Sequence, residues 1–430
     1  KIFIISSIIL FIFSNPIFFI EGIYNLLHFT TNYIIGKPDS SGINMPNILS
    51  TITEAQKRPI NMTMSAILSN NYINFIGLLS FIIISLFFYK KIIPIIPLFL
   101  LGIISFKSSI RFVMFLAPFV GIGYGLLIHF IVEKFKISEK YNEFYVYIGS
   151  LLFAILLTVV LIAKTSFYNY TPIPSIQQDI VKSFIDIKNK GFKDAKIVTW
   201  WDYGYAIEDI TSYATFHDGG SQNTLKTYLI AKSLTNNDQR TLYNIINLLS
   251  GYKIETINKL FNSNLSFKEI FKNINNNNNK DDIYLLFTSD MITKYNAISQ
   301  IGSFNIKTGS SQPGGYQLLN CSSFTNKQLE CGKFSIDLTS GLINNKIPLK
   351  NVSFVSNGEI KDSFDYFDNG LFAEILIKNR SIIGVFLLEE NTYRSNFNQI
   401  YILGNYNSTH LTEVYNNFPS ARMFKIVNNK

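Results

Sequence analysis

The hydrophobic pattern divides the chain into an apolar N-terminal part and a mixed C-terminal part. Five apolar stretches approach the roughly 20 residues that a helix needs to cross a bilayer, namely Ile2–Ile20, Ile73–Tyr89, Ile92–Phe106, Phe112–Val132 and Tyr145–Ala163. The third stretch is short and contains Pro94 and Pro97, which membrane helices tolerate when neighbouring helices satisfy the freed carbonyls. The pattern predicts a polytopic α-helical membrane domain over residues 1–164.

Basic residues in two short connections predict how this domain is oriented. Lys90 and Lys91 separate the second and third stretches, while Lys134, Lys136 and Lys140 separate the fourth and fifth. Short cytoplasmic connections are enriched in Lys and Arg, so both connections are predicted to be cytoplasmic. The external loop over residues 21–72 and everything after residue 164 are then predicted to lie on the outer side.

The region over residues 165–430 is predicted to be an outer α/β domain with a β-rich insertion. Helical patterns alternate with short β-rich runs, which is typical of an α/β core. The predicted helices are Ser175–Lys188, Thr224–Leu234, Arg240–Leu249 and Met291–Gln300, and the predicted strands are Ala195–Trp200 and Asp282–Phe287. Beyond Gly302 strands prevail, at Phe334–Leu338, Leu371–Ile377 and Ile382–Leu388, before Gln399–Ile426 returns to the core.

Composition narrows the classes of partner. The 430 residues are 47% hydrophobic and carry a net charge of +9. The Lys residues are scattered and no nucleic-acid motif occurs, so the charge does not indicate a nucleic-acid partner. It fits an anionic lipid head group or simple solubility. The two cysteines, Cys321 and Cys331, fall in the predicted outer domain, where either a disulfide or two free thiols would be expected.

The most informative chemistry lies in the run Trp200-Trp201-Asp202-Tyr203-Gly204, which holds both tryptophans of the chain. An indole N–H only donates a hydrogen bond and an ionised Asp only accepts, so the trio can surround a hydroxyl group from both sides. The alternative is that the paired tryptophans anchor the domain at the membrane interface. The run directly follows a predicted strand, at the end where loops of an α/β sheet gather ligands.

This run resembles the signature of the catalytic subunit of oligosaccharyltransferase, the enzyme of asparagine-linked glycosylation. Other segments agree with the bacterial single-subunit, PglB-type members. Thr51-Ile52-Thr53-Glu54 is similar to the T-I-x-E motif of an external loop, and His217-Asp218-Gly219-Gly220 follows at the family's distance. Met291–Ile298 resembles the M-x-x-I helix motif except at Lys294, and the ending over residues 401–426 is also similar.

The resemblance implies a catalytic role for Glu54. A carboxamide nitrogen is a poor nucleophile, and Glu54 would accept from the acceptor Asn side chain while binding Mn²⁺ or Mg²⁺. The alternative is a solvated loop carboxylate, the usual fate of Glu. The chain opens without Met, and the family's first-loop Asp and D-x-D motif have no counterpart in it. We therefore expect a chain that starts within a longer protein, with the remaining metal ligands upstream.

The part of the site that binds the lipid-linked glycan, the donor side, is expected to involve Arg111, Tyr205 and His217. Bacterial members carry a pyrophosphate-binding Arg at the position of Arg111, and the planar guanidinium matches phosphate oxygens in pairs. The alternative is an interfacial Arg that only reaches toward the head groups. Lys107 is a weaker candidate. His217 belongs to the segment that the resemblance places near the lipid-linked sugar, and Tyr205 is a candidate contact or a packing residue.

The acceptor side is expected to involve Trp200, Trp201, Asp202, Met291 and Lys294. On a helix Met291, Lys294 and Ile298 share one face, and Asp290 is placed to pair with Lys294. The Lys294 stem would then pack on the methyl group of an acceptor Thr, although a solvated helical Lys is the alternative. Acid-demanding relatives carry an Arg some twelve positions after the catalytic Glu, where this chain has Thr63–Ala66, so a relaxed sequon is predicted.

These patterns predict a bacterial inner-membrane oligosaccharyltransferase with a periplasmic C-terminal domain. It would move a glycan from a polyprenyl-diphosphate carrier to Asn in Asn-x-Ser/Thr of acceptor proteins. One alternative is a module that binds sequons without transferring sugar, because most metal ligands are missing from the chain. A second is a membrane polysaccharide ligase or polymerase, which would have no need for a pocket that reads a peptide hydroxyl.

Overall fold

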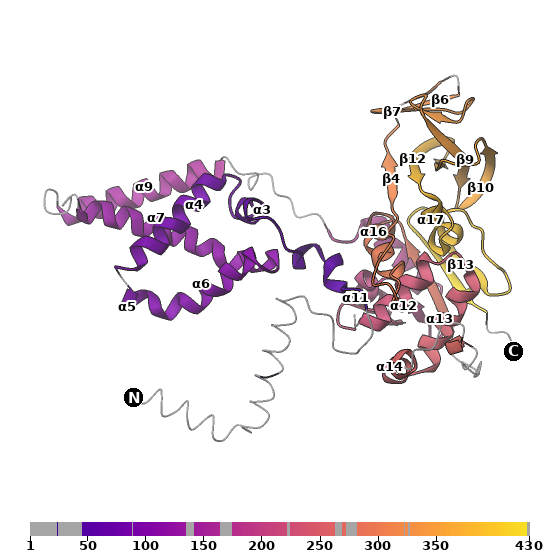
Figure 1. The fold of residues 1–430 in the computed structure, drawn as a ribbon, viewed down its shortest axis with the longest axis horizontal. Helices are drawn as coiled ribbons and strands as arrows, with labels where there is room; N and C mark the ends of the chain where they lie inside the picture. The colour runs from indigo at the N-terminus through magenta and orange to yellow at the C-terminus, as the bar shows by residue number, and fades with distance from the viewer. Residues whose placement is uncertain are drawn as a thin grey trace. The chain divides into compact units, whose positions relative to one another are not determined.

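The computed structural model describes residues 24, 45–87, 89–134, 142–163, 174–221, 224–262, 269–271, 282–321, 323–325 and 327–427. The chain forms two compact units (Figure 1). The helical unit comprises residues 1–37 and 49–173, and the α/β unit comprises residues 38–48 and 174–430.

The helical unit is built from apolar helices joined by short 3₁₀ turns. Its helices are α3 (Ile60–Ser65), α4 (Asn71–Ser85), α5 (Tyr89–Ile92), α6 (Ile96–Ile103), α7 (Val113–Lys134) and α9 (Glu143–Ala163). Its 3₁₀ turns are η1 (Ile48–Thr51), η2 (Thr53–Ala55), η3 (Ile93–Ile95), η4 (Ile104–Phe106) and η5 (Ile110–Phe112). Ile2–Ile20, the first predicted span, lies outside the described residues.

Two glycines let α4 and α7 pack backbone against backbone. A Cβ added to Gly123 would lie 1.8 Å from the carbonyl oxygen of Gly77, so a side chain cannot be accommodated there. Close approach through small residues is typical of helix contacts in membrane proteins. The Tyr124 hydroxyl adds a hydrogen bond to the Ile73 carbonyl at 2.7 Å, which joins the two helices.

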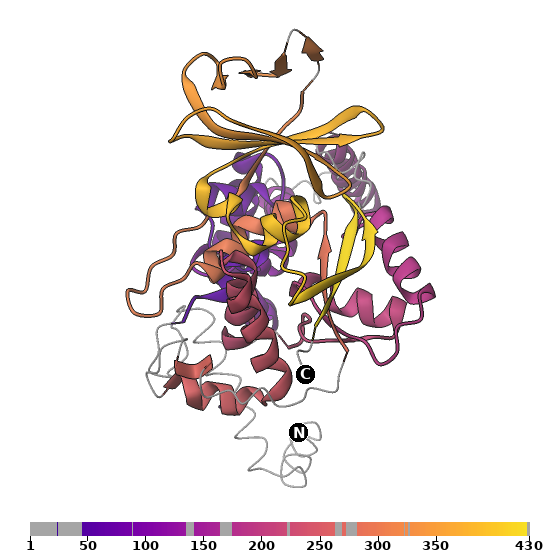
Figure 2. The same cartoon turned by 90° about the vertical axis from the view of Figure 1, so that its right-hand side faces the viewer.

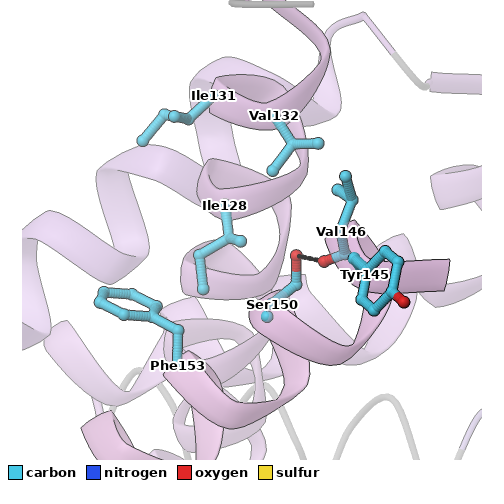
Figure 3. A pocket seen from close by; sticks show the side chains of 8 residues that line it. Ile128, Ile131, Val132, Tyr145, Val146, Ser150 and Phe153 are labelled. Atoms are coloured by element: carbon cyan, nitrogen blue, oxygen red, sulfur yellow. Dashed lines mark hydrogen bonds between the residues drawn. The ribbon is translucent and has the colours of Figure 1, made fainter. Parts of the chain in front are cut away.

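Of the described helices, only the continuous segment Ile110–Lys134 is both long and apolar enough to cross a membrane. Asn71–Ser85, Ile93–Phe106 and Phe144–Leu156 are shorter apolar helices. Pro94 and Pro97 lie where the third predicted span is divided between η3 and α6, as expected for residues that lack a backbone N–H. Between α7 and α9 lies an apolar hollow of about 470 Å³ (Figure 3), in which the Ser150 hydroxyl is bound to the Val146 carbonyl.

The α/β unit has a mixed central sheet of five strands among the described residues, in the order β13-β14-β3-β1-β2. β1 is parallel to β2 and β3, whereas β14 is antiparallel to both β3 and β13. The bounds are β1 (Lys196–Val198), β2 (Ala214–Thr215), β3 (Ile283–Thr288), β13 (Leu411–Asn417) and β14 (Ala421–Ile426). Every residue of β3 is buried, as expected for a strand covered on both faces.

Helices surround this sheet. They are α10 (Gln178–Asn189), α11 (Gly204–Thr211), α12 (Thr224–Thr235), α13 (Gln239–Gly251), α14 (Ile254–Asn262), α16 (Met291–Gly302) and α17 (Glu390–Tyr393), with the 3₁₀ turn η7 (Trp201–Tyr203) and the π-helical turn η8 (Asn398–Ile402). The predicted α/β core is confirmed: four predicted helices correspond to α10, α12, α13 and α16, and two predicted strands correspond to β1 and β3. The sequence pattern missed α11, α14 and β2.

The predicted β-rich insertion forms a second sheet, with nine strands in the described ranges. Its bounds are β4 (Tyr316–Leu319), β5 (Ser323–Thr325), β6 (Gln328–Cys331), β7 (Phe334–Asp337), β8 (Leu342–Ile343), β9 (Ile347–Ser356), β10 (Glu359–Asp365), β11 (Leu371–Lys378) and β12 (Ser381–Leu388). Figure 2 shows this sheet lying across one end of the α/β core. A disulfide joins Cys321 and Cys331, which decides between the two expectations for these cysteines.

Candidate functional site

The tryptophan motif lies at the carboxyl end of β1. The chain leaves β1 at Val198, makes the turn η7 and enters α11 at Gly204. A Cβ on Gly204 would lie 2.5 Å from both the Asp218 Cβ and the His217 carbonyl oxygen. Glycine is therefore required there, because the backbone of the motif passes directly against the segment that carries His217.

The two tryptophans have different environments. The Trp200 indole is buried, with 2% of its surface exposed, and lies edge-on to the His217 ring at 6.0 Å between centroids. Trp201 is partly exposed, yet its Nε1 atom is buried and has no acceptor among the described residues. A buried donor without a partner is unusual in proteins and indicates a place for an external acceptor. Trp200 thus forms a wall behind the site, and Trp201 supplies the donor.

Asp202 pairs with a residue that the sequence pattern did not connect to it. The Lys294 Nζ atom lies 3.2 Å from Asp202 Oδ1 and 3.9 Å from Asp290 Oδ2. The predicted pairing with Asp290 is therefore the longer of the two. Lys294 Nζ also lies 4.6 Å from the centroid of the Tyr203 ring, a cation–π arrangement. These contacts hold the Asp202 carboxylate in one position, on the residue that follows Trp201 in the chain.

The floor of this site is apolar and uncharged. Tyr203 is fully buried, and burial raises the pKa of its phenol, which keeps it protonated beneath Lys294. Met291 is also fully buried and belongs to the hydrophobic core of the unit. The first turn of α16 directs the Met291 side chain into the core, while Lys294 reaches Asp202, so an acceptor contact of Met291 stays a prediction.

His217 lies in the interior of the α/β unit. The ring is fully buried, and its Nε2 atom lies 3.0 Å from the hydroxyl of Thr227 on α12. Burial lowers the pKa of His217 to about 3, so the ring is neutral at physiological pH. The ring also contacts Trp200, and its expected contact with the lipid-linked sugar stays a prediction.

Tyr205 remains accessible on the first turn of α11. Its side chain is 59% exposed, and its hydroxyl would lie 2.4 Å from a Cβ placed on Gly220. Gly220 belongs to a tight turn in which Asp218 Oδ1 accepts from the backbone N–H groups of Gly220 and Ser221. Tyr205 therefore covers this turn and presents an aromatic face outward.

Arg111 and Glu54, the two site residues predicted in the helical unit, contact each other. Arg111 and Glu54 form an ion pair, with 2.9 Å between Nη2 and Oε2. Two further contacts join the segments that carry them: the Ser109 hydroxyl donates to the Glu54 carbonyl at 2.5 Å, and the Ile110 N–H donates to the Gln56 carbonyl at 3.1 Å. The T-I-T-E loop is thus held against the 3₁₀ turn η5, which carries Arg111 and leads into α7.

The expected metal site is represented by one ligand. Glu54 offers carboxylate oxygens, which Mn²⁺ and Mg²⁺ prefer, but a single carboxylate does not complete such a site. In the part of the chain that the structure describes, no group of three or more His, Cys, Asp or Glu side chains is placed to hold a metal ion. The residues present do not fit a complete site, so no step is assigned to a metal.

Comparisons with known proteins place the site within a defined domain. Residues 193–308 match the family model of the STT3/PglB/AglB core domain. The chain is 22% identical over 443 aligned residues to the undecaprenyl-diphosphooligosaccharide–protein glycotransferase of Campylobacter jejuni, covering 94% of this chain and 61% of that protein. It thus spans about three fifths of the length of that curated relative.

Solved structures resemble the chain at low sequence identity. The apo oligosaccharyltransferase of Archaeoglobus fulgidus is 13% identical, with a TM-score of 0.50, over 96% of this chain and 44% of that one. The C-terminal domain of PglB from C. jejuni is 18% identical, with a TM-score of 0.42, over 57% of this chain and 99% of that one. At such identities the likeness concerns the fold.

Proposed function

We propose that this chain is an oligosaccharyltransferase of the PglB type, a glycosyltransferase that reads Asn-x-Ser/Thr and receives a glycan from a polyprenyl-diphosphate carrier. The observation that carries the proposal is the Trp201 Nε1 donor, buried and without an acceptor among the described residues, followed in the chain by the Asp202 carboxylate. A hydroxyl group donates one hydrogen bond and accepts others, so it matches this pair. A carbonyl or an ammonium group would satisfy only one of the two.

Acceptor reading follows from this arrangement. The hydroxyl two residues after the acceptor Asn would donate to Asp202 and accept from Trp201. Lys294 holds the carboxylate from the other side, so Asp202 does not need to be ordered when the peptide binds. Trp200 and Tyr203 exclude water from behind, which strengthens both hydrogen bonds.

The donor side of the proposal assigns consecutive roles to Arg111 and Glu54. The diphosphate of the lipid carrier would compete with Glu54 for the Arg111 guanidinium, whose fork matches phosphate oxygens. Release of Glu54 would then leave its carboxylate available to accept a hydrogen bond from the acceptor amide. Arg111 would also stabilise the negative charge that develops on the leaving diphosphate. Glu54 would supply one carboxylate ligand to a Mn²⁺ or Mg²⁺ ion, and no step of this proposal is assigned to the metal.

Localisation belongs to the same proposal. The apolar helices of the unit that carries Glu54 support a multi-pass position in the bacterial inner membrane, with α7 as its longest span. The Lys-rich connections before α6 and after α7 support a cytoplasmic position for those connections, and the proposal therefore assigns Glu54, Arg111 and the α/β unit to the periplasmic side. Lipid-linked substrate and secreted acceptor proteins would meet there.

The experiment measures transfer by the full-length protein to matched peptides that carry Thr or Ala two residues after Asn. A site built to bind a hydroxyl rejects an analogue without one by about 10⁴ to 10⁵, so the Ala peptide is expected to be nearly inert. Asp202→Ala should lower the rate on the Thr peptide toward that of the Ala peptide. Lys182→Ala, an exposed cation on α10, serves as the control. A rate above half the native value for Asp202→Ala would overturn the assignment.

A module that binds sequons without transfer is the second candidate, and the lack of a complete ligand group among the described residues favours it. Peptide binding and glycan transfer are therefore measured separately on the same preparation. Binding that discriminates Thr from Ala, without any transfer in the presence of Mn²⁺ and lipid-linked donor, would support the second candidate over the first.

A further inference from the structure

A second polar depression lies in the α/β unit, where the β-rich insertion meets the core. It has a volume of about 440 Å³ and is lined by Asn237, Gln239, Lys350, Asn351, Asp365, Phe372, Tyr393, Arg394, Gln399 and Asn405. These residues come from the α12–α13 turn and the start of α13, from strands β9 to β11, and from the segment that runs from the end of α17 to just beyond η8. Junctions of this kind are preferred positions for ligand sites.

Five of the ten lining side chains are carboxamides, and internal hydrogen bonds hold four of them in place, namely Gln239, Asn351, Gln399 and Asn405. Gln239 Nε2 donates to the Asn405 carbonyl at 2.8 Å. Gln399 Nε2 donates to the Tyr393 carbonyl at 2.7 Å, and Gln399 Oε1 accepts from Asn405 Nδ2 at 2.9 Å. A carboxamide can make about four hydrogen bonds, so each retains capacity toward a ligand after these contacts. The donors and acceptors are thus ordered before anything binds.

An aromatic pair contributes the apolar part of the depression. The rings of Phe372 and Tyr393 are stacked, with 3.9 Å between centroids and 14° between planes. Phe372 is 4% exposed and therefore supports Tyr393 from beneath. A flat aromatic surface beside fixed carboxamides is suited to a ring that has apolar C–H faces and a polar edge.

The charges at this site balance one another. Lys350 Nζ lies 3.5 Å from Glu390 Oε1, and Arg394 Nη2 lies 2.8 Å from the same oxygen. The cations lower the pKa of Glu390, the charge of Lys350 first, which keeps the carboxylate ionised. Asp365 adds a second carboxylate and accepts from Asn351 at 2.8 Å. Two cations and two carboxylates leave little net charge, which disfavours a phosphate or another strongly anionic ligand.

We propose that this depression, the carboxamide pocket, binds a neutral sugar. Sugar hydroxyls donate and accept at once, as carboxamides do, and a pyranose ring presents C–H faces to an aromatic ring. The inference rests on the proposed function, which supplies an oligosaccharide to this unit. The carboxamide pocket is separate from the tryptophan motif, because the two lie at opposite ends of α12. Thr227, which contacts His217 behind the motif, lies in the first turn of α12, whereas Asn237 of the pocket follows its last turn. A remote contact of this kind would hold the outer residues of the glycan.

The test measures sugar binding by saturation-transfer difference NMR on the full chain in detergent, without lipid donor or peptide. The neutral probes are maltose and N,N′-diacetylchitobiose, and the anionic probes are glucuronate and inorganic phosphate. At least one neutral probe is expected to bind. Asn237→Leu is expected to weaken that binding about tenfold or more, a change of about 1.4 kcal/mol. Its carboxamide makes no hydrogen bond within the described residues, so the variant should fold.

Two controls keep the outcomes distinct. Gln178→Leu changes an exposed carboxamide on α10, outside the pocket, and should bind like the native chain. Asp202→Ala should also bind sugar normally, so failure of acceptor reading and failure of the carboxamide pocket are separable. The proposal is overturned if no neutral probe binds, if only the anionic probes bind, or if Asn237→Leu binds as well as Gln178→Leu.

Discussion

Two carboxylates of this protein each pair with one cation at nearly the same distance, yet their surroundings differ. Asp202 lies 3.2 Å from Lys294, and their side chains are 25% and 30% exposed. Glu54 lies 2.9 Å from Arg111, and their side chains are 69% and 53% exposed. The comparison teaches that burial, rather than distance, separates a carboxylate held for recognition from one that can exchange partners.

The physical reason is dielectric screening. An exposed ion pair gains about 0–1 kcal/mol because water screens both charges and the long side chains lose entropy when they are fixed. A partly shielded pair supported by the Tyr203 ring is screened less, so its geometry persists when a ligand arrives. Asp202 is therefore suited to recognise one hydroxyl, and Glu54 is suited to leave Arg111 when a diphosphate competes.

The largest expected effect is a pH dependence of the unfolding free energy, caused by a third carboxylate that is fully buried. Glu374 on β11 accepts from Asn398 at 2.6 Å, and burial raises its pKa to about 8. The folded state then binds a proton that the unfolded state releases above its own pKa near 4.5. The unfolding free energy should fall as pH rises from about 4.5 to about 8, by a few kcal/mol. Glu374→Gln should remove most of that slope.

The measurement is chemical denaturation at pH 5 and pH 9, followed by tryptophan fluorescence. Trp200 and Trp201 are the only tryptophans of the chain, so the signal reports on the α/β unit. The exposed Glu359→Gln serves as the matched control and should keep the native slope. A Glu374→Gln variant with an unchanged pH dependence would show that Glu374 does not titrate across this range.

The next largest effect is expected when the hydrogen-bond donor of the tryptophan site, the indole N–H of Trp201, is removed. Trp201→Phe keeps an aromatic ring but removes the buried N–H that has no acceptor among the described residues. A hydrogen bond of this kind contributes about 1.5–3 kcal/mol when one partner is charged or strongly polarised, so transfer to a Thr peptide should fall about 10- to 100-fold. Peptides with Ala at that position should be unaffected by the variant. An equal loss on both peptides would indicate a general packing defect.

A smaller effect is expected from Lys294. The stem of Lys294 is placed to offer a contact surface for the methyl group of an acceptor Thr, so Thr peptides should react faster than Ser peptides. Lys294→Ala should reduce this preference several-fold, which corresponds to about 1 kcal/mol. Lys307→Ala, a lysine beyond α16, is the control. Equal rates for Thr and Ser peptides in the native enzyme would leave Lys294 without a role in reading the methyl group.

The exposed pair should show the smallest coupling. A double-mutant cycle with Glu54→Gln and Arg111→Gln, followed by thermal unfolding, is expected to give a coupling energy below about 1 kcal/mol. Added salt should reduce it further, since both side chains are exposed. A coupling above 2 kcal/mol would mean that the pair is a fixed structural element and would contradict the proposed exchange with diphosphate.

The residue two positions before the acceptor Asn is predicted to have almost no influence on the transfer rate. The stretch over residues 63–66 contains no cation, and both Thr63 and Met64 are fully buried in the helical unit. Arg58 is the nearest candidate to pair with an acid at that position. Matched peptides with Asp or Ala there should differ less than about threefold, whereas a tenfold preference for Asp would contradict a relaxed sequon.

The sequence by itself determined the local elements and the identity of the reading motif. Helical periodicity predicted α12 and α16, a buried apolar run predicted β3, and the turn after β1 was predicted to carry Trp201 and Asp202. These predictions succeed because periodicity and turn chemistry act over a few residues of neighbouring chain. The C-terminal segment over residues 399–426 was predicted to return to the core, and it supplies the strands β13 and β14 of the core sheet.

Only the tertiary structure decided which of these side chains meet. Sheet order brings α16 beside η7, so Lys294 reaches Asp202 rather than mainly its neighbour on the helix, Asp290. Packing buries Trp200 and His217, and the sequence pattern did not predict that burial. The carboxamide pocket likewise joins three segments that are far apart along the chain. The physical reason is that burial and long-range pairing depend on how layers stack, and no local pattern encodes that stacking.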